Sequence, residues 1–327
     1  MKKSINFLLV LIIIVLTCSC FMSCKNEDTN ENVEEPLFEF VEGKSTQIKF
    51  GKFPQTVTDV DVSLIKSGTK DKKTGYYTYQ DKEYAIITSS LNDESNSSFW
   101  NGTKVENNKE YAFLVEPIVW DILKTSDDSY LLLSNMVLTS SAFQTNYGVH
   151  DKEYYYKDSD GNLDLDTKDT HGTYANEYSV SLVRLYLQNT FYSVAFNEKQ
   201  QSIIETTTLN NHQGDSVYAK LQQDTKDKVF ILSYTEATNN TYGFTEENPQ
   251  RRIKQVTDYA LCNGAYAYCY SYSGTMTKNS MWYLRSAGDD ALHVLKVDST
   301  GEISKTSGTH ISESTYMGIV PALYIKK

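Results

Sequence analysis

Cys262 and Cys269 are the two cysteines outside the N-terminal region, and they flank the stretch "NGAYAY". Thiolates are strong nucleophiles, so an exposed pair of cysteines in a deep cleft could do catalytic chemistry. In an oxidising compartment the same two residues could instead form a disulfide, and buried thiols would be inert. Their spacing matches no CxxC motif, so the residues by themselves leave these readings open.

Side-chain oxygens recur at alternate positions in "DSDGNLDLD", residues 158–166, as they do in calcium-binding loops. The candidate ligands are Asp158, Asp160, Asn162, Asp164 and Asp166. Gly161 is not where an EF-hand loop needs its glycine, and no glutamate stands at the twelfth position. A hairpin turn at Asp160-Gly161 is therefore the favoured interpretation, and calcium binding is the alternative.

The five histidines are scattered and form neither an HxxxH nor an HExxH motif. Transition-metal sites usually need such clustered ligands. The sequence also has no GxSxG stretch around a serine and no glycine-rich phosphate loop. We therefore predict neither a cofactor nor a dedicated metal site.

Tyrosine is abundant, with 25 residues against 3 tryptophans. Tyr268, Tyr270 and Tyr272 alternate within "AYAYCYSYSG", residues 265–274. Because side chains of a strand alternate between its faces, these three would share one face. Exposed, they form a candidate ligand-binding surface. The alternative is that they are ordinary strand tyrosines of the core.

The N-terminus has the features of an export signal: Lys2 and Lys3, then an apolar run from Phe7 to Leu16. Ten apolar residues are too few to cross a membrane, which takes about twenty. The cysteines that follow resemble a lipobox, with Cys24 as the predicted lipidation site and Cys20 as the alternative. We therefore expect a lipoprotein signal peptide over residues 1–23 and a palmitate-type lipid anchor in a bacterial cell envelope.

An acidic, asparagine-rich segment over residues 24–37 is predicted to be a disordered tether, followed by a single domain over 38–327. Without residues 1–23 the chain has 29 basic and 42 acidic side chains, a net charge of −13. Nucleic-acid binding depends on releasing counterions from phosphates through Lys and Arg. We therefore expect no nucleic-acid partner.

Apolar runs predict strands over much of this domain. The segment "TQIKFGKFPQT" is expected to be a strand that Pro54 ends, and "GYYTYQDKEYAIITSS" a hairpin that turns at Gln80-Asp81. "EYAFLVEPIVWDILKT" and "SYLLLSNMVLTSSAF" read as two strands joined by "SDDS". A buried strand is also expected in "KDKVFILSYTEA", and further strands in "SMWYLRSAG", "ALHVLKVDSTGEIS" and "GIVPALYIKK".

Helical spacing appears after residue 180. Leu182, Leu185, Phe191 and Phe196 are predicted to be the buried face of a helix, with Asn197 capping a second one. A third helix is expected in "NPQRRIKQVTDYALCNGAY", with Thr257 or Asp258 capping its final turns. The predicted fold class is therefore α+β: mostly antiparallel strands with two or three packed helices.

An ordered series of motifs, "FGKFPQT", "EPIVWDIL", "SLVRLYLQNTFY", "WYLRSAG" and "GIVPAL", resembles a bacterial domain family of unknown function found in secreted proteins and lipoproteins. The resemblance extends from about residue 47 to 326. The chain departs from the family pattern at "LYLQN", where Trp-Leu-Asn is usual, and at Val320-Pro321, where Arg-Pro is frequent.

The C-terminal half is also distantly similar to the C-type-lectin-like fold of formylglycine-generating enzymes and bacterial variable surface lipoproteins. The resemblance implies structural roles for Trp282, Arg285 and Arg184. A buried arginine needs a partner, and Glu116, Glu236 and Asp258 are the candidates for Arg285.

Two functions follow from these resemblances. The first is a membrane-tethered lectin-like domain that binds an unknown glycan or protein ligand in the periplasm or outside the cell. The alternative is an enzyme of formylglycine-generating ancestry that uses Cys262 and Cys269.

Overall fold

The computed structural model describes residues 36–91, 97–165, 172–214, 216–245, 249–272, 275–304, 308–313 and 317–327, without the side chains of 268–276. Residues 37–327 form one compact unit. The predicted signal peptide, Cys20, Cys24 and nearly all of the tether lie outside the described residues. In the part that is described, no helix has the length and apolar character needed to cross a membrane.

The first sheet joins the two ends of the domain. Its strands are β1 (Glu39–Phe40), β2 (Gln47–Val57), β3 (Thr69–Lys70), β4 (Tyr77–Tyr79), β5 (Lys82–Thr88), β6 (Glu110–Thr125), β7 (Ser129–Ser134) and β21 (Ala322–Lys326). They are ordered β1-β2-β6-β5-β4-β3, and β7 connects β6 to the C-terminal strand β21. All of these pairings are antiparallel. The short helix α2 (Val62–Lys66) contacts β4 and β6.

Two predictions for this sheet are decided by backbone geometry. The hairpin at Gln80-Asp81 is confirmed, because both residues have positive φ between β4 and β5. The prediction that Pro54 ends a strand is wrong, since β2 continues past it and Pro54 lies opposite Val115. Proline removes an N–H, which a strand tolerates on an unpaired side. Among the described residues β1 pairs with β2 only at Ile48 and Lys49, so no described strand needs an N–H from Pro54 on that edge of β2.

The remaining strands form smaller sheets. One contains β9 (Thr139–Ser140), β17 (Trp282–Ala287), β18 (His293–Val297), β19 (Thr309–His310) and β20 (Gly318–Ile319) in the order β19-β18-β17-β20-β9. Another contains β8 (Met136–Val137), β14 (Lys254–Val256), β15 (Tyr268–Tyr272) and β16 (Thr275–Ser280). Two sheets have two strands each: β10 (Tyr147–His150) with β11 (Glu153–Tyr156), and β12 (Thr207–Leu209) with β13 (Thr225–Asp227). Most pairs are antiparallel, with β14/β8 and β17/β20 parallel.

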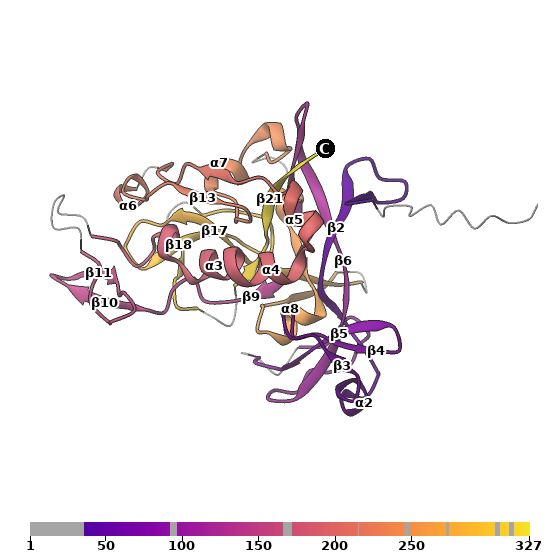
Figure 1. Ribbon diagram of the computed structural model, residues 1–327. Helices are drawn as coiled ribbons and strands as arrows, with labels where there is room; N and C mark the ends of the chain where they lie inside the picture. Colours follow the sequence, from indigo (N-terminus) through magenta and orange to yellow (C-terminus); the bar gives the residue numbers. More distant parts are fainter. Residues whose placement is uncertain are drawn as a thin grey trace, which may run out of the picture. The chain divides into compact units, whose positions relative to one another are not determined.

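Helices are few and short, so the fold is strand-rich α+β (Figure 1). Besides α2 they are α3 (Leu182–Leu185), α4 (Tyr192–Ala195), α5 (Glu198–Ile203), α6 (Val217–Lys220), α7 (Tyr234–Ala237) and α8 (Asp258–Cys262). The 3₁₀ helices are η1 (Tyr178–Val180), η3 (Asn240–Tyr242) and η4 (Pro249–Arg252), and η2 (Tyr186–Phe191) is a π-helix.

The predicted helical face is partly wrong. Phe191 and Phe196 are buried, but Leu182 is half-buried and Leu185 is 42% exposed. The buried positions of α3, η2 and α4 are instead Val183, Leu187, Phe191 and Ala195. In an α-helix each step of four residues drifts by about 40° around the axis, and the wider π-turn between α3 and α4 offsets this drift, so these four positions stay on one side. The predicted cap at Asn197 is confirmed and forms a capping box with Gln200.

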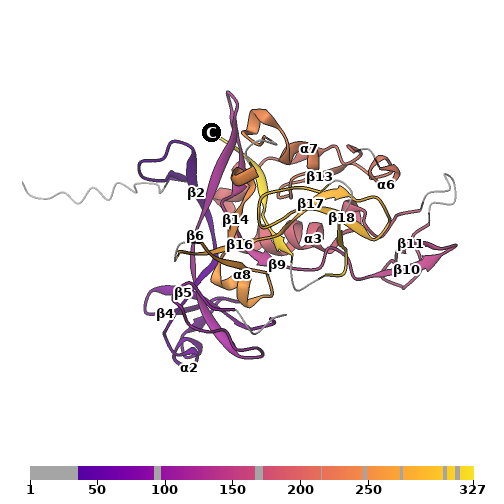
Figure 2. The same ribbon diagram turned by 180° about the vertical axis from the view of Figure 1, so that it is seen from behind.

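The expected helix over 248–266 is interrupted by β14, which is held between β8 and β16. Its last part forms α8, with Thr257 as the N-cap. α8 contacts β14, and Figure 2 shows the two elements from behind. Pairing with two strands distant in sequence overrides the local helical pattern here.

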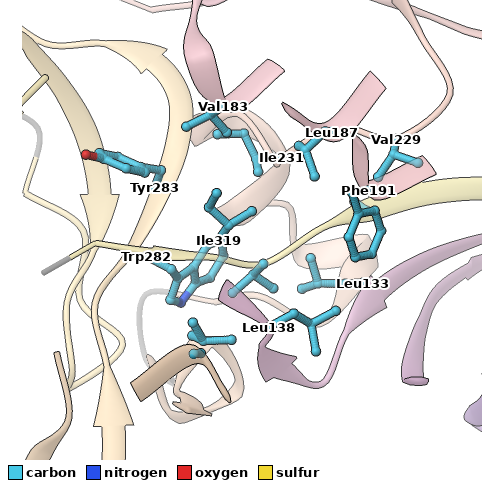
Figure 3. Close-up of a cluster of buried hydrophobic side chains, with 14 of the residues drawn as sticks. Leu133, Leu138, Val183, Leu187, Phe191, Val229, Ile231, Trp282, Tyr283 and Ile319 are labelled. Carbon is cyan, nitrogen blue, oxygen red and sulfur yellow. The ribbon is translucent and has the colours of Figure 1, made fainter. Parts of the chain in front are cut away.

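The core lies between the helical segment and the strands. Figure 3 shows Val183, Leu187 and Phe191 facing Ile231, Trp282 and Ile319. Trp282 is fully buried, and its indole N–H donates to the Arg252 carbonyl at 3.0 Å. The predicted buried strand in "KDKVFILSYTEA" is an extended buried segment, Val229–Leu232, that makes one bridge at Phe230↔Ala322 and runs into α7.

Candidate functional site

Arg285 is buried inside β17 and its guanidinium is held on several sides. Two of its nitrogens contact the Glu236 carboxylate, Nη1 at 2.5 Å and Nη2 at 3.0 Å. Nε donates to Asn211 Oδ1 at 2.8 Å, and Nη1 also donates to the Ile231 carbonyl at 2.7 Å. Of the three carboxylates considered from the sequence, Glu236 is therefore the partner. The forked geometry fixes the planar group in one orientation.

Glu236 has a second role in the capping box of α7, in which Ser233 is the N-cap and Glu236 the third helical residue. Its carboxylate accepts from the Ser233 N–H at 2.8 Å, while Ser233 Oγ accepts from the Glu236 N–H. A helix of four residues has little intrinsic stability. The position of α7 therefore depends on a side chain that is also bonded to Arg285.

A chain of hydrogen bonds connects Arg285 to the second structural arginine, Arg184. Asn211 Nδ2 donates to Thr225 Oγ1 at 3.2 Å, and Thr225 donates to Asp227 at 2.8 Å. The fully buried Asp227 then pairs with Arg184 at 2.8 Å. We call Glu236, Arg285, Asn211, Thr225, Asp227 and Arg184 the buried polar chain. It links β17, β13, α7 and α3 through charge-assisted and neutral hydrogen bonds.

A pocket of about 430 Å³ lies next to one end of this chain. Its lining comes from α6 and the segment before it, the start of α7, the end of β17 with the turn that follows, and β18. Figure 1 labels these four elements. The residues are Gln213, Gly214, Ser216, Ala219, Tyr234, Thr235, Ser286, Ala287, Asp289 and Leu295. Pockets of about 300–1,000 Å³ are typical of small-ligand sites.

Three segments of this lining are adjacent in sequence to the bonded groups of Arg285. Gln213 follows Asn211 by two residues, Thr235 directly precedes Glu236, and Ser286 directly follows Arg285. The Tyr234 N–H also donates to Ser286 Oγ at 2.9 Å, which ties α7 to β17. Arg285 is therefore placed to hold three walls of the pocket in register.

The pocket lining combines polar and apolar surface and carries little charge. Asp289 is the one ionisable carboxylate among the described lining residues, and none of these is Lys, Arg or His. The side chains of Gln213, Thr235 and Asp289 form no hydrogen bond within the described part of the chain. Ala219, Ala287 and Leu295 supply an apolar surface. Such a mixture of hydrogen-bonding groups and apolar surface can bind a small ligand.

Cys262 does not have the environment of a catalytic thiol. It is fully buried at the end of α8. Burial raises the pKa of its thiol to about 12, with the negative charge of Asp258 adding to the effect. The reactive thiolate is therefore scarce at neutral pH. The Cys269 side chain lies outside those described, so a bridge to it stays untested.

The other predicted site residues are only partly described. Tyr268, Tyr270 and Tyr272 lie on the extended strand β15, paired with β16, but their side chains are outside those described. Asp158 accepts from the N–H groups of Asp160 and Asn162, both at 2.9 Å, around Gly161 with φ +83°. This is the turn preferred from the sequence, and Asp166 lies outside the described residues. Within the described residues no group of three or more His, Cys, Asp or Glu is arranged to hold a metal.

Sequence reasoning missed the pocket because its lining is contributed by four separate segments and contains no motif. The available signal was indirect. An arginine inside the apolar strand "WYLRSAG" needs a buried polar partner. The segment that carries this partner must therefore lie beside the strand in the folded protein.

Comparison with protein families gives one match. A domain of unknown function, DUF6273, matches residues 127–327, which is more than half of the chain. The match includes the expected motifs "SLVRLYLQNTFY", "WYLRSAG" and "GIVPAL" but begins after "FGKFPQT" and "EPIVWDIL", so it is shorter than the resemblance predicted from about residue 47. Neither the curated proteins nor the solved structures gave a match. All pocket residues and the whole buried polar chain lie in the matched region, and the chain belongs to the DUF6273 family.

Proposed function

We propose that the protein is a lipid-anchored binding module of a bacterial cell envelope, with its ligand site in the pocket beside Arg285. The observation that carries the binding role is the pocket itself, where unpaired polar side chains face a space of about 430 Å³. The lipid anchor rests on the N-terminal sequence, and the lectin-like character on the resemblance of the C-terminal motifs. The acidic surface makes proteins or glycans better partners than nucleic acids.

The binding role is tested with a glycan and protein array probed by the full chain in detergent. Thr235 is exposed at the pocket, so Thr235→Trp should fill the space with little effect on the core. Thr208→Trp is the matched control, because Thr208 is exposed on β12 and outside the pocket lining. Binding should be lost in the first variant and kept in the second. An array signal that survives Thr235→Trp, or an empty array, contradicts the proposal.

The anchor is tested separately by mass spectrometry of the N-terminal peptide. We expect diacylglyceryl and acyl groups on Cys24, and Cys24→Ser should move the protein from the detergent phase to the aqueous phase. Lipid on Cys20 instead would mean that Cys20 is the lipidation site. An N-terminus without lipid would contradict the proposed anchor.

A further inference from the structure

The chemistry of the pocket lining restricts the class of ligand that fits. From the residues that line the space, we infer that the pocket binds an uncharged, polyhydroxylated ligand of saccharide type directly, without a bridging metal ion. This inference rests on the proposed function, because it names the ligand class of the same site.

Charge disfavours anions and does not favour cations. Asp289 is an exposed carboxylate at the pocket, and the described lining contains no cation to offset it. The nearest arginine, Arg285, is 2% exposed and its guanidinium is bonded to Glu236, Asn211 and a carbonyl. A phosphate or carboxylate would therefore meet repulsion. A cation would meet one solvated carboxylate, which holds an ion pair weakly.

The polar groups are suited to hydroxyls, because a hydroxyl both donates and accepts. Asp289 is an acceptor, the Gln213 amide both donates and accepts, and the Thr235 hydroxyl does the same. Ser286 Oγ accepts from the Tyr234 N–H, which leaves its own proton available to the pocket. Neighbouring hydroxyls of a sugar ring can satisfy such alternating donors and acceptors together.

The apolar part of the lining complements the rest of such a ligand. Ala219, Ala287 and Leu295 are buried residues that contribute to the wall formed by α6, β17 and β18. The C–H face of a pyranose ring is weakly apolar, so it can cover this surface while its hydroxyls point to the polar side chains. An entirely apolar ligand would leave Gln213 and Asp289 without partners.

A calcium bridge to the sugar would need six to eight oxygen ligands, several of them from the protein. The described lining has one carboxylate, and no metal-binding cluster is present among the described residues. Direct hydrogen bonds are therefore the mode of recognition that these residues support.

The test is isothermal titration of the full chain in detergent at pH 7, with and without EDTA. The probes are the methyl glycosides of glucose, galactose and N-acetylglucosamine, with glucuronate as the anion and glucosamine as the cation. At least one neutral glycoside should bind, and EDTA should not change its affinity. Asp289→Asn and Gln213→Ala should each weaken it by about tenfold or more. Asp59→Asn, an exposed carboxylate outside the lining, should leave it unchanged.

Charge adds a second readout. Glucuronate should bind at least about tenfold more weakly than the neutral glucoside, and Asp289→Asn should narrow that gap because it removes a repulsive charge. Tighter binding of glucuronate or glucosamine, abolished by Gln213→Ala, would overturn the ligand class while the pocket remained the binding site. The ligand class would also be wrong, with the pocket still the binding site, if Thr235→Trp abolished binding of a ligand found on the array and no neutral glycoside bound the wild type. If a neutral glycoside binds with the same affinity to every pocket variant, both the inferred ligand class and the location of the site are wrong. If EDTA abolishes glycoside binding, recognition needs a metal ion and the inferred direct hydrogen bonding is wrong.

Discussion

Two buried cations in neighbouring parts of the molecule, Arg285 on β17 and Lys254 on β14, are held in different ways. The Lys254 side chain is 3% exposed, and its ammonium contacts the Asp121 carboxylate at 2.7 Å. The Arg285 side chain is 2% exposed and makes four directed bonds to two side chains and a carbonyl. Burial lowers the pKa of Lys254, because desolvation outweighs the attraction of Asp121.

The difference shows what each cation contributes. Lysine is a point charge that can lose its proton, whereas arginine stays charged and its fork imposes geometry on its partners. Lys254 joins two strands at one point. Arg285 fixes three segments relative to one another, and these segments form the pocket. The two ion pairs should therefore respond differently to substitution.

Arg285→Lys should produce the largest effect. A lysine cannot bond Glu236, Asn211 and the Ile231 carbonyl together, so buried partners are left unpaired. We expect a loss of about 3–5 kcal/mol in the free energy of unfolding measured with urea. Arg251→Lys, at an exposed position of η4, is the control. A loss below about 1 kcal/mol would mean that Arg285 does not hold the walls.

Asn211→Ala interrupts the buried polar chain while it leaves the pair of Arg285 and Glu236 in place. The Arg285 Nε–H and the Thr225 hydroxyl then lose a partner inside the protein. We expect a destabilisation of about 1–3 kcal/mol, read from the same urea curves. The exposed neighbour Asn210→Ala should cost little, and equal effects at the two positions would contradict the proposed link.

Lys254→Met should have a smaller effect than either. It removes a charge whose burial is costly, and Asp121 remains partly exposed and bonded to Gln47 at 2.7 Å. Removing one partner of a buried ion pair is costly when the other charge stays buried and unpaired, but Asp121 is solvated on one side and keeps its bond to Gln47. We expect a change within about 1 kcal/mol in either direction. A loss as large as that of Arg285→Lys would remove the contrast between the two pairs.

The pH dependence of stability isolates Lys254. Because its folded pKa lies below the value of 10.5 in the unfolded chain, the unfolded state binds more protons between those two values, and stability rises with pH there. Tyr259, whose pKa burial raises to about 12, acts in the opposite direction: its contribution is complete below pH 10 and is lost as the pH rises through 12.

Both wild type and Lys254→Met contain Tyr259, so their difference cancels the tyrosine contribution. Thermal melts in steps from pH 7 to 10.5 should show wild type gaining on the variant as the pH rises. A difference that stays constant across that range would mean that Lys254 is charged throughout.

Much of the fold could be predicted from local chemistry. The hairpin at Gln80-Asp81, the cap at Asn197 and the strand character of the C-terminal motifs depend on residues close in sequence, and the structure has them. The prediction for Leu185 is wrong because the buried row of α3 and η2 runs through Val183, Leu187 and Phe191, and the π-turn that aligns this row leaves little signal in the sequence. Pro54 and the segment around Lys254 were misjudged because their conformations depend on which strands lie beside them.

For the candidate site, the sequence determined that Arg285 would need a buried partner, because a charge inside an apolar strand is too costly unpaired. Only the tertiary structure decided that Glu236, rather than Glu116 or Asp258, is that partner. Glu116 and Asp258 instead accept hydrogen bonds from backbone N–H groups, of Thr56 and of Val57 and Trp100. The pocket likewise exists because β17, α6 and α7 are brought together by contacts between residues far apart in sequence, and composition and spacing do not encode such contacts locally.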